Sequence, residues 1–265
     1  MIKAFFGLTN FPFSKDIEDI FISRQLQYLQ ARGAHFLETQ GIALITGEAG
    51  SGKTTFIRKF TASLNHNSYS CFYLSNTVHS MRGFLRSMAS ALGLKPVFFT
   101  DELISQVKSE LTNIYSKQRI IPILVIDEAQ NLSDQALEQI RLMTNFNMDS
   151  KNCVAVFLLG HPVLKARLKL SPYAALKQRI SFSCHLTGLE QDEINPYVTH
   201  RLKLVGCSKP LFTDDAVTLM FNYSKGLPRL INTIAHEALY IAAEQKVSLV
   251  DDKLVEGIIQ SWDNL

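Results

Sequence analysis

The chain has 265 residues, with 27 basic and 24 acidic side chains and a formal net charge of +3. This length allows a full hydrophobic core in one large domain or two ordinary ones. The four cysteines are far apart and form no C-x-x-C pair, which excludes the usual zinc and dithiol motifs. No uncharged apolar run approaches the roughly 20 residues that span a bilayer, and the N-terminus lacks the pattern of a signal peptide. We therefore expect a cytoplasmic protein without an integral membrane segment.

Short apolar runs alternate with helical patterns in the first two thirds of the chain. The runs rich in β-formers predict buried strands at 41–46, 70–75, 120–126 and 154–159. Apolar residues at helical spacing predict helices at 23–39, from the turn at 47–54 to about 64, and at 80–92, 101–117 and 133–144. Each parallel strand pair needs a crossover helix. This order therefore predicts an α/β fold in which helices cover both faces of a parallel sheet.

Beyond about residue 188 the pattern changes to helices alone. They are predicted at 190–205, 213–224, 228–244 and 250–262. We therefore expect an α/β domain over 1–188, including an N-terminal extension, and a small all-helical domain over 189–265. Of all charged side chains, 20 basic and 13 acidic ones lie in residues 1–188. This basic surplus could face a polyanion or be ordinary surface charge.

Residues 47–54 read Gly-Glu-Ala-Gly-Ser-Gly-Lys-Thr and fit the pattern G-x-x-x-x-G-K-[ST]. The pattern stands between a predicted strand and a predicted helix, the context in which it indicates a P-loop. Glycines let the backbone close around a β-phosphate, and the start of the helix adds its positive dipole end. Lys53 places an ammonium on the β- and γ-phosphates, and the Thr54 hydroxyl ligates Mg²⁺. The predicted ATP-binding residues are Gly47, Glu48, Ala49, Gly50, Ser51, Gly52, Lys53, Thr54 and Thr55.

Two acidic residues, Asp127 and Glu128, follow the apolar run 120–126. Ligands of such folds bind at the carboxyl ends of the parallel strands. We expect Asp127 to hold Mg²⁺ and Glu128 to polarise the attacking water as a general base. An acidic pair after a strand can also cap a helix, but the matched P-loop favours the catalytic interpretation. The pair predicts hydrolysis of ATP rather than nucleotide sensing alone.

With these two motifs, the chain resembles the AAA+ ATPases typified by the ExeA-type secretion ATPase and by the TnsC- and TniB-type helper ATPases of bacterial transposons. The resemblance also rests on Asp127-Glu-Ala-Gln130, on Phe6-Gly-Leu-Thr-Asn-Phe-Pro-Phe13 and on Gly226-Leu-Pro-Arg229. It covers nearly the whole chain. It implies an AAA+ fold in which the helical part forms a lid, and a homo-oligomer that assembles as a ring or a filament.

The resemblance implies roles for residues outside the two motifs. Arg229 matches the sensor 2 arginine, which reaches from the lid to the γ-phosphate, although it could instead cap a neighbouring helix. Arg179 matches an arginine finger that enters the adjacent subunit's site, with Arg167 and Lys177 as alternatives. His161 stands at the sensor 1 position, where relatives tend to have a glutamine, and it could donate the corresponding hydrogen bond to the attacking water.

Two functions are compatible with such an ATPase. A transposition helper would assemble on duplex DNA with ATP and recruit or activate a transposase. Arg82, Arg86 and Lys95 are then candidate phosphate contacts, or else ordinary surface charge. An ExeA-type ATPase would instead assemble a secretion or pilus system. The secretion type continues into a transmembrane segment and a peptidoglycan-binding region, whereas this chain stops at Leu265. On that basis we expect the transposition helper.

Overall fold

The computed structural model describes residues 2–14, 19–75, 80–144 and 152–263. The chain groups into two compact units, which we call the helical unit and the sheet unit. The helical unit comprises Met1–Gln27, Ala49–Gly52 and Thr187–Leu265, and the sheet unit comprises Tyr28–Glu48 and Lys53–Leu186. The N-terminal residues thus group with the C-terminal helices, whereas the sequence pattern placed them in the α/β domain.

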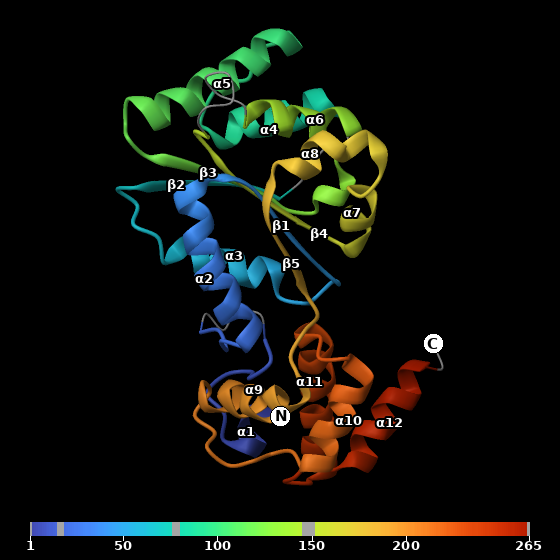
Figure 1. Cartoon of the computed structure of the whole chain (residues 1–265). Coiled ribbons are helices and arrows are strands. Elements are labelled where there is room, and N and C mark those ends of the chain that lie inside the picture. The colour runs from blue at the N-terminus through green and yellow to red at the C-terminus, as the bar shows by residue number, and fades with distance from the viewer. Residues whose placement is uncertain (1, 15–18, 76–79, 145–151, 264–265) are drawn as a thin grey trace. The chain divides into compact units, whose positions relative to one another are not determined.

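Within the described residues, five parallel strands form the sheet in the order β2-β3-β4-β1-β5. The strands are β1 (Gly41–Gly47), β2 (Tyr69–Leu74), β3 (Ile121–Ile126), β4 (Ala155–Gly160) and β5 (Ile180–Leu186). The main helices of this part of the chain are α2 (Arg24–Thr39), α3 (Lys53–Ala62), α4 (Met81–Ala91), α5 (Thr100–Ser116) and α6 (Asp134–Met143). In Figure 1, α2 and α3 lie on one face of the sheet and α4, α5 and α6 on the other. The predicted α/β fold is therefore confirmed.

Some short elements were not predicted. The strand β5 pairs with β1 at the edge of the sheet, and Phe182 and Leu186 are its buried side chains. An edge strand of this kind lacks the continuous apolar run by which the other four strands were recognised. Other short elements in the described part of the sheet unit contain too few residues to show a helical period: α7 (Pro162–Arg167), α8 (Ala174–Gln178) and the 3₁₀ helices η1 (Ala129–Asn131) and η3 (Ser171–Tyr173).

Aromatic side chains fill the face of the sheet that α2 and α3 cover. The ring of Phe157 packs edge-on against Phe36 of α2 and Phe60 of α3, with centroid distances of 5.0 and 5.8 Å. Gly33 lies against the Phe60 ring, where a Cβ atom would come within 3.0 Å. A glycine inside a helix costs stability, but here it permits the close approach of α2 and α3.

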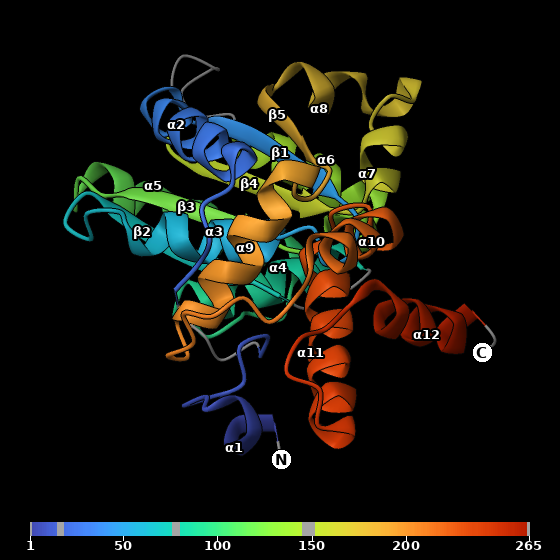
Figure 2. The same ribbon diagram turned by 90° about the horizontal axis from the view of Figure 1, so that it is seen from below.

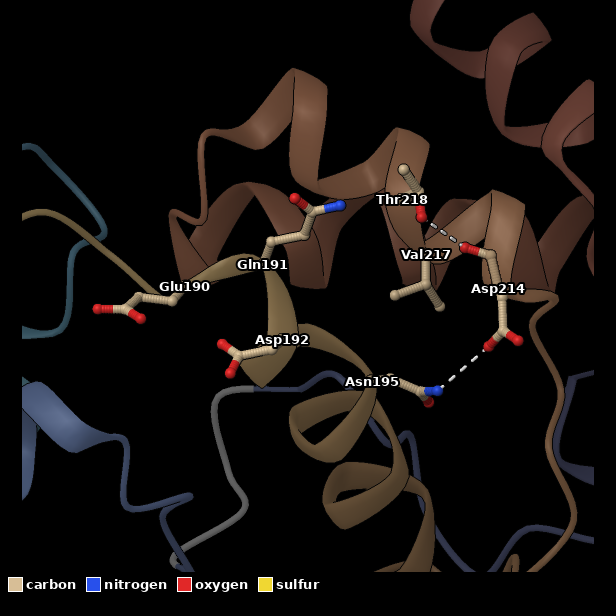
Figure 3. Close-up of a pocket in the computed structure, with 7 residues that line it drawn as sticks. All are labelled: Glu190, Gln191, Asp192, Asn195, Asp214, Val217 and Thr218. Atoms are coloured by element: carbon tan, nitrogen blue, oxygen red, sulfur yellow. Dashed lines mark hydrogen bonds between the residues drawn. The ribbon is translucent and has the colours of Figure 1, made fainter.

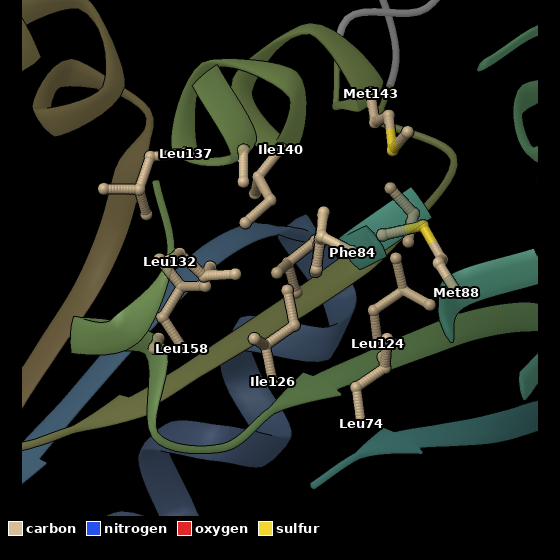
Figure 4. Close-up of a cluster of buried hydrophobic side chains, with 14 of the residues drawn as sticks. Leu74, Phe84, Met88, Leu124, Ile126, Leu132, Leu137, Ile140, Met143 and Leu158 are labelled. Carbon is tan, nitrogen blue, oxygen red and sulfur yellow. The ribbon is translucent and has the colours of Figure 1, made fainter. Parts of the chain in front are cut away.

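The opposite face is packed with aliphatic and methionine side chains around Phe84 (Figure 4). Phe84 is 0% exposed, so Phe84→Ala leaves a cavity, and we expect the free energy of unfolding to fall by about 3–5 kcal/mol. The matched control is Phe98→Ala, because that ring is 69% exposed and its stacking on Arg82 contributes at most about 1 kcal/mol. Urea denaturation followed by circular dichroism measures both, and equal losses would contradict this account of the core.

The helical unit has its own hydrophobic core. Its helices are α1 (Ile2–Phe6), α9 (Gln191–Lys203), α10 (Asp214–Ser224), α11 (Pro228–Gln245) and α12 (Asp252–Asp263). Figure 2 shows α10 and α12 beside α11, and all three are in contact. Ile2, Leu8 and Phe13 are buried in the same core, which explains why the N-terminus groups with this unit. No helix in the described parts of the chain combines the length and hydropathy needed to cross a bilayer.

Candidate active site

The P-loop connects β1, which is buried along its whole length, to α3. Lys53 is 8% exposed, and its ammonium group donates hydrogen bonds to the carbonyl oxygens of Gly47 (2.7 Å) and Glu48 (2.9 Å). The loop contains two positive φ angles, +85° at Gly50 and +100° at Gly52, which glycine adopts without steric cost. The Ser51 hydroxyl is buried and has no hydrogen-bond partner among the described residues. A polyphosphate could bind here, because the ammonium of Lys53 supplies a positive charge, the glycines allow a tight turn, and the Ser51 hydroxyl has a hydrogen left to donate.

Asp127, at the end of β3, is 6% exposed and accepts three hydrogen bonds. The hydroxyls of Thr54 (2.9 Å) and Tyr73 (2.7 Å) donate to its Oδ2 atom, and the Glu128 backbone N–H donates to Oδ1 (2.9 Å). Burial raises the pKa of the Tyr73 hydroxyl, as do its hydrogen bond to Asp127 and the charge of Glu128, so this group stays protonated and donates. Carboxylate and hydroxyl oxygens are suitable ligands for Mg²⁺. The Asp127 carboxylate and the Thr54 hydroxyl are hydrogen-bonded to each other and so lie close enough to share one ion.

Glu128 follows Asp127 in a left-handed backbone conformation, with φ 52°. Such conformations in residues other than glycine cost energy and cluster at functional sites. The Gln130 amide donates to Glu128 Oε2 at 2.6 Å, and its Oε1 atom accepts from the His161 backbone N–H at 3.0 Å. Gln130 thus connects the acidic end of β3 to the end of β4. The sequence pattern gave no role to this residue.

His161 connects the same network to the P-loop. Its Nε2 atom lies 2.6 Å from Glu48 Oε2, so the predicted sensor 1 side chain contacts a residue of the P-loop. Gly160 leaves room for this arrangement, because a Cβ atom there would lie 2.9 Å from Gln130 Oε1. A chain of contacts therefore runs from Glu48 through His161 and Gln130 to Glu128.

We expect Gln130→Ala to lower kcat for ATP hydrolysis by about 10- to 100-fold, because Glu128 loses the donor that orients its carboxylate. The KM for ATP should stay within about twofold, since Gln130 does not lie in the P-loop. Steady-state kinetics measures both constants. The matched control is Gln135→Ala, an exposed position on α6. A raised KM with an unchanged kcat would argue against a positioning role for Gln130.

The three candidates for an arginine finger differ in their surroundings. Lys177 is exposed, and Arg179 follows the last residue of α8 as its C-cap. Arg167, by contrast, is bound within the sheet unit to four groups that follow Glu128 in the chain: the carbonyl oxygens of Gln130 and Leu132, the Tyr173 hydroxyl and the Asp134 carboxylate. Arg167 therefore stabilises the turn after Glu128 through contacts within its own chain.

Arg229, the predicted sensor 2 residue, lies beside the P-loop residue Gly50 in the helical unit. Its backbone N–H donates to Gly50 O at 3.4 Å, and a Cβ atom on Gly50 would come within 2.5 Å of Arg229 Cβ. The arginine follows Pro228, which occupies the first turn of α11 and needs no hydrogen-bond acceptor there. This packing fixes the backbone of Arg229 against the loop.

The three predicted nucleic-acid residues are exposed on α4 or on the segment after it. The Arg82 guanidinium lies 4.6 Å from the centroid of the Phe98 ring and donates to Phe98 O at 2.8 Å. Arg86 makes no hydrogen bond or ion pair with the described residues. Arg82 thus contributes to loop structure, whereas Arg86 and Lys95 present their charge to solvent.

A separate hollow in the helical unit has an acidic character (Figure 3). It is lined by Glu190, Asp192 and Asp214, among others, and Asn195 donates to Asp214 Oδ1 at 3.3 Å. Arg24 forms ion pairs with Glu190 and Asp192 and thereby neutralises part of this charge. None of the predicted site residues lines this hollow, and its charge is opposite to what a polyanion needs.

Comparisons with known proteins place the chain in a family. A family model described as "AAA domain" matches residues 35–168. General secretion pathway protein A from Aeromonas hydrophila is 33% identical over 279 residues, an alignment that covers 98% of this chain and 47% of that protein. The chain thus spans about half the length of this relative.

Two solved structures share the fold. Cdc6p from Pyrobaculum aerophilum has a TM-score of 0.68 at 17% identity, covering 90% of this chain and 67% of that one. The Aeropyrum pernix ORC1 protein, solved in complex with DNA, has a TM-score of 0.66 at 16% identity, covering 95% and 68%. These structural likenesses confirm a P-loop AAA+ fold, and the family model matches half of the sequence. The chain belongs to the AAA domain family.

Proposed function

We propose that the chain hydrolyses ATP as its Mg²⁺ complex at the P-loop and the carboxyl end of β3. The observation that supports this most directly is the bonded set of Thr54, Asp127 and Glu128 beside the buried ammonium of Lys53. Lys53 and the loop 47–55 bind the phosphates, and Thr54 and Asp127 hold Mg²⁺, which neutralises developing charge when bound. Glu128 orients the attacking water and takes its proton, while Gln130 holds the Glu128 carboxylate in place.

Residues outside this set complete the proposed machinery. The contact between Arg229 and Gly50 supports a sensor 2 role, in which residues 189–265 act as a lid over the nucleotide. Arg179 is the proposed arginine finger, supplied to the neighbouring subunit of a ring or filament. A finger given in trans accelerates phosphoryl transfer by about 10³- to 10⁵-fold, so activity would depend on assembly. His161 contacts Glu48 through its ring and Gln130 through its backbone N–H, and both contacts would support the residues around the attacking water.

We further propose that ATP drives assembly on duplex DNA and that the assembled protein recruits or activates a transposase. The exposed cations Arg86 and Lys95 support DNA as the partner. The fold shared with an ORC1 protein solved in complex with DNA supports the same partner. Contacts of this kind bind phosphates without reading sequence, and they weaken steeply with salt.

A second function is favoured by one specific observation. General secretion pathway protein A aligns with 98% of this chain at 33% identity, far above the identities of the structural neighbours. An ATPase that assembles a secretion or pilus system therefore competes with the transposition helper. Such a protein would respond to a protein or membrane partner rather than to DNA.

Duplex DNA distinguishes the two functions. We would measure ATP hydrolysis with and without DNA at low salt for the wild type and Glu128→Gln, and follow assembly by light scattering. A transposition helper hydrolyses ATP faster on DNA, and its Glu128→Gln variant accumulates large ATP-dependent complexes. If DNA changes neither rate nor scattering, the DNA proposal fails and the secretion function is preferred.

A further inference from the structure

A shallow hollow opens on the sheet unit between α4 and the end of β2. It has a volume of about 370 Å³ and is lined by the side chains of Ser75, Arg86, Ser87 and Ser90 together with Tyr73. We call it the α4 hollow. Arg86, Ser87 and Ser90 project from neighbouring positions on one side of α4, because residues three and four apart on a helix lie side by side. Among the described residues that line the hollow, none is acidic.

The polar groups of the α4 hollow are available to a ligand. The side chains of Ser75, Arg86, Ser87 and Ser90 make no hydrogen bond or ion pair with any described residue. A guanidinium fork with several hydroxyl donors matches the oxygens of a phosphate group, and arginine is the cation best suited to bidentate phosphate binding. The chemistry of the hollow thus favours a phosphate-bearing polyanion.

Tyr73 belongs both to this hollow and to the candidate active site. Its side chain is 45% exposed and lines the hollow, while its hydroxyl donates to Asp127 Oδ2 at 2.7 Å. The Thr54 hydroxyl donates to the same oxygen, so both lone pairs of Oδ2 are used. A phenol has one hydrogen to donate. If Tyr73 turns toward a ligand in the hollow, Asp127 therefore regains an acceptor for the hydration shell of Mg²⁺.

We propose that the α4 hollow binds a backbone phosphate of a polyanion, and that Tyr73 signals to Asp127 whether the hollow is occupied. Tyr73 is then a positioning residue, which restrains the Mg²⁺ carboxylate until the hollow is filled. This inference rests on the proposed DNA function for the identity of the polyanion, but its chemistry requires only phosphate groups. It explains how DNA would accelerate hydrolysis within one subunit, before any arginine finger is supplied.

Two variants of the full chain, Arg86→Gln and Tyr73→Phe, separate binding from transmission. Their matched controls are Arg58→Gln and Tyr28→Phe, exposed positions elsewhere in the sheet unit. The probes are duplex DNA and inorganic polyphosphate at low salt. Binding is measured by the fluorescence anisotropy of a labelled duplex without nucleotide, and transmission by the ratio of ATPase rates with and without each probe. As a readout independent of turnover, the Mg²⁺ dependence of binding of a fluorescent ADP is titrated with and without DNA.

We expect Arg86→Gln to weaken binding of the duplex and to lose the rise in ATPase rate. Tyr73→Phe should bind the duplex as tightly as wild type. It should hydrolyse ATP about tenfold faster than wild type in the absence of DNA, because one hydrogen bond to a charged carboxylate is removed. Its rate ratio should fall close to one, and DNA should no longer shift its Mg²⁺ dependence. Both controls should behave as wild type.

The outcomes distinguish this inference from the DNA function. If DNA stimulates the wild type and both variants equally, the inference is overturned while the DNA function stands. If polyphosphate acts through Arg86 and Tyr73 but duplex DNA has no effect, the inference stands and the DNA function fails. If neither probe binds the wild type or changes its rate, the α4 hollow is no phosphate site and the inference is overturned.

Discussion

Glu128→Gln is expected to lower kcat for ATP hydrolysis by about 10²- to 10⁴-fold while leaving ATP affinity unchanged, the usual effect of removing a general base. The amide introduced at position 128 has the size and shape of the carboxylate. It still offers an oxygen to the Gln130 amide, which donates to Glu128 Oε2 at 2.6 Å. The orientation of the side chain is therefore kept. The variant loses the negative charge and the ability to accept a proton from water, and both act on the attacking water, which is why the effect should fall on kcat.

Two measurements check this expectation. Isothermal titration with ATP in the presence of Mg²⁺ reports affinity, and a phosphate-release assay reports kcat. The matched control is Glu244→Gln, an exposed carboxylate on α11, which should keep the wild-type rate. A Glu128→Gln variant that retains more than about a tenth of the wild-type kcat would contradict the assignment of the base. Asp127 or a water held by another residue would then have to be considered.

Three of the four predicted strands are those whose burial is almost continuous. The strands β1, β3 and β4 are covered on both faces, so nearly all of their side chains must be apolar and each strand appears as an apolar run in the sequence. The edge strand β5 is half-buried, so alternation over seven residues was too weak a signal. Residues 1–27 group with the C-terminal helices, because Ile2 and Leu8 are buried among side chains far away in the sequence, and a local pattern does not reveal such partners.

Some residues of the candidate site can be predicted from local sequence motifs, whereas the roles of others depend on contacts between distant parts of the chain. The P-loop and the acidic pair are predictable because each motif is contiguous and its spacing carries the chemistry. The roles of Tyr73, Gln130 and Arg167 depend on which strands lie side by side, and one sequence does not contain that information. The sequence nonetheless contained one signal for Gln130. It stands two residues after Glu128, so its side chain in the following turn can reach back to the Glu128 carboxylate.

Gly226 is the residue of Gly226-Leu-Pro-Arg229 whose replacement should most disturb the helical unit. Its φ is +77°, and a Cβ atom there would lie 2.0 Å from the carbonyl oxygen of Leu189. The two segments are held together at this point, because Leu189 N donates to Gly226 O at 2.8 Å. A side chain at position 226 would therefore force apart the backbones that precede α9 and α11.

We expect Gly226→Ala to lower the free energy of unfolding of the helical unit by about 3–5 kcal/mol, from backbone strain and overpacking together. Gly206→Ala is the control, because it lies in the same unit with φ +84° and its nearest contact would be an ordinary 3.7 Å. In Gly206→Ala only the backbone strain of the positive φ angle arises, so its free energy of unfolding should fall by about 1–2 kcal/mol. Urea denaturation of both measures the difference. Equal losses would mean that the backbones of Gly226 and Leu189 move apart at little cost. The glycine at position 226 would then be required by its positive φ angle rather than by the close contact that positions α11 and Arg229.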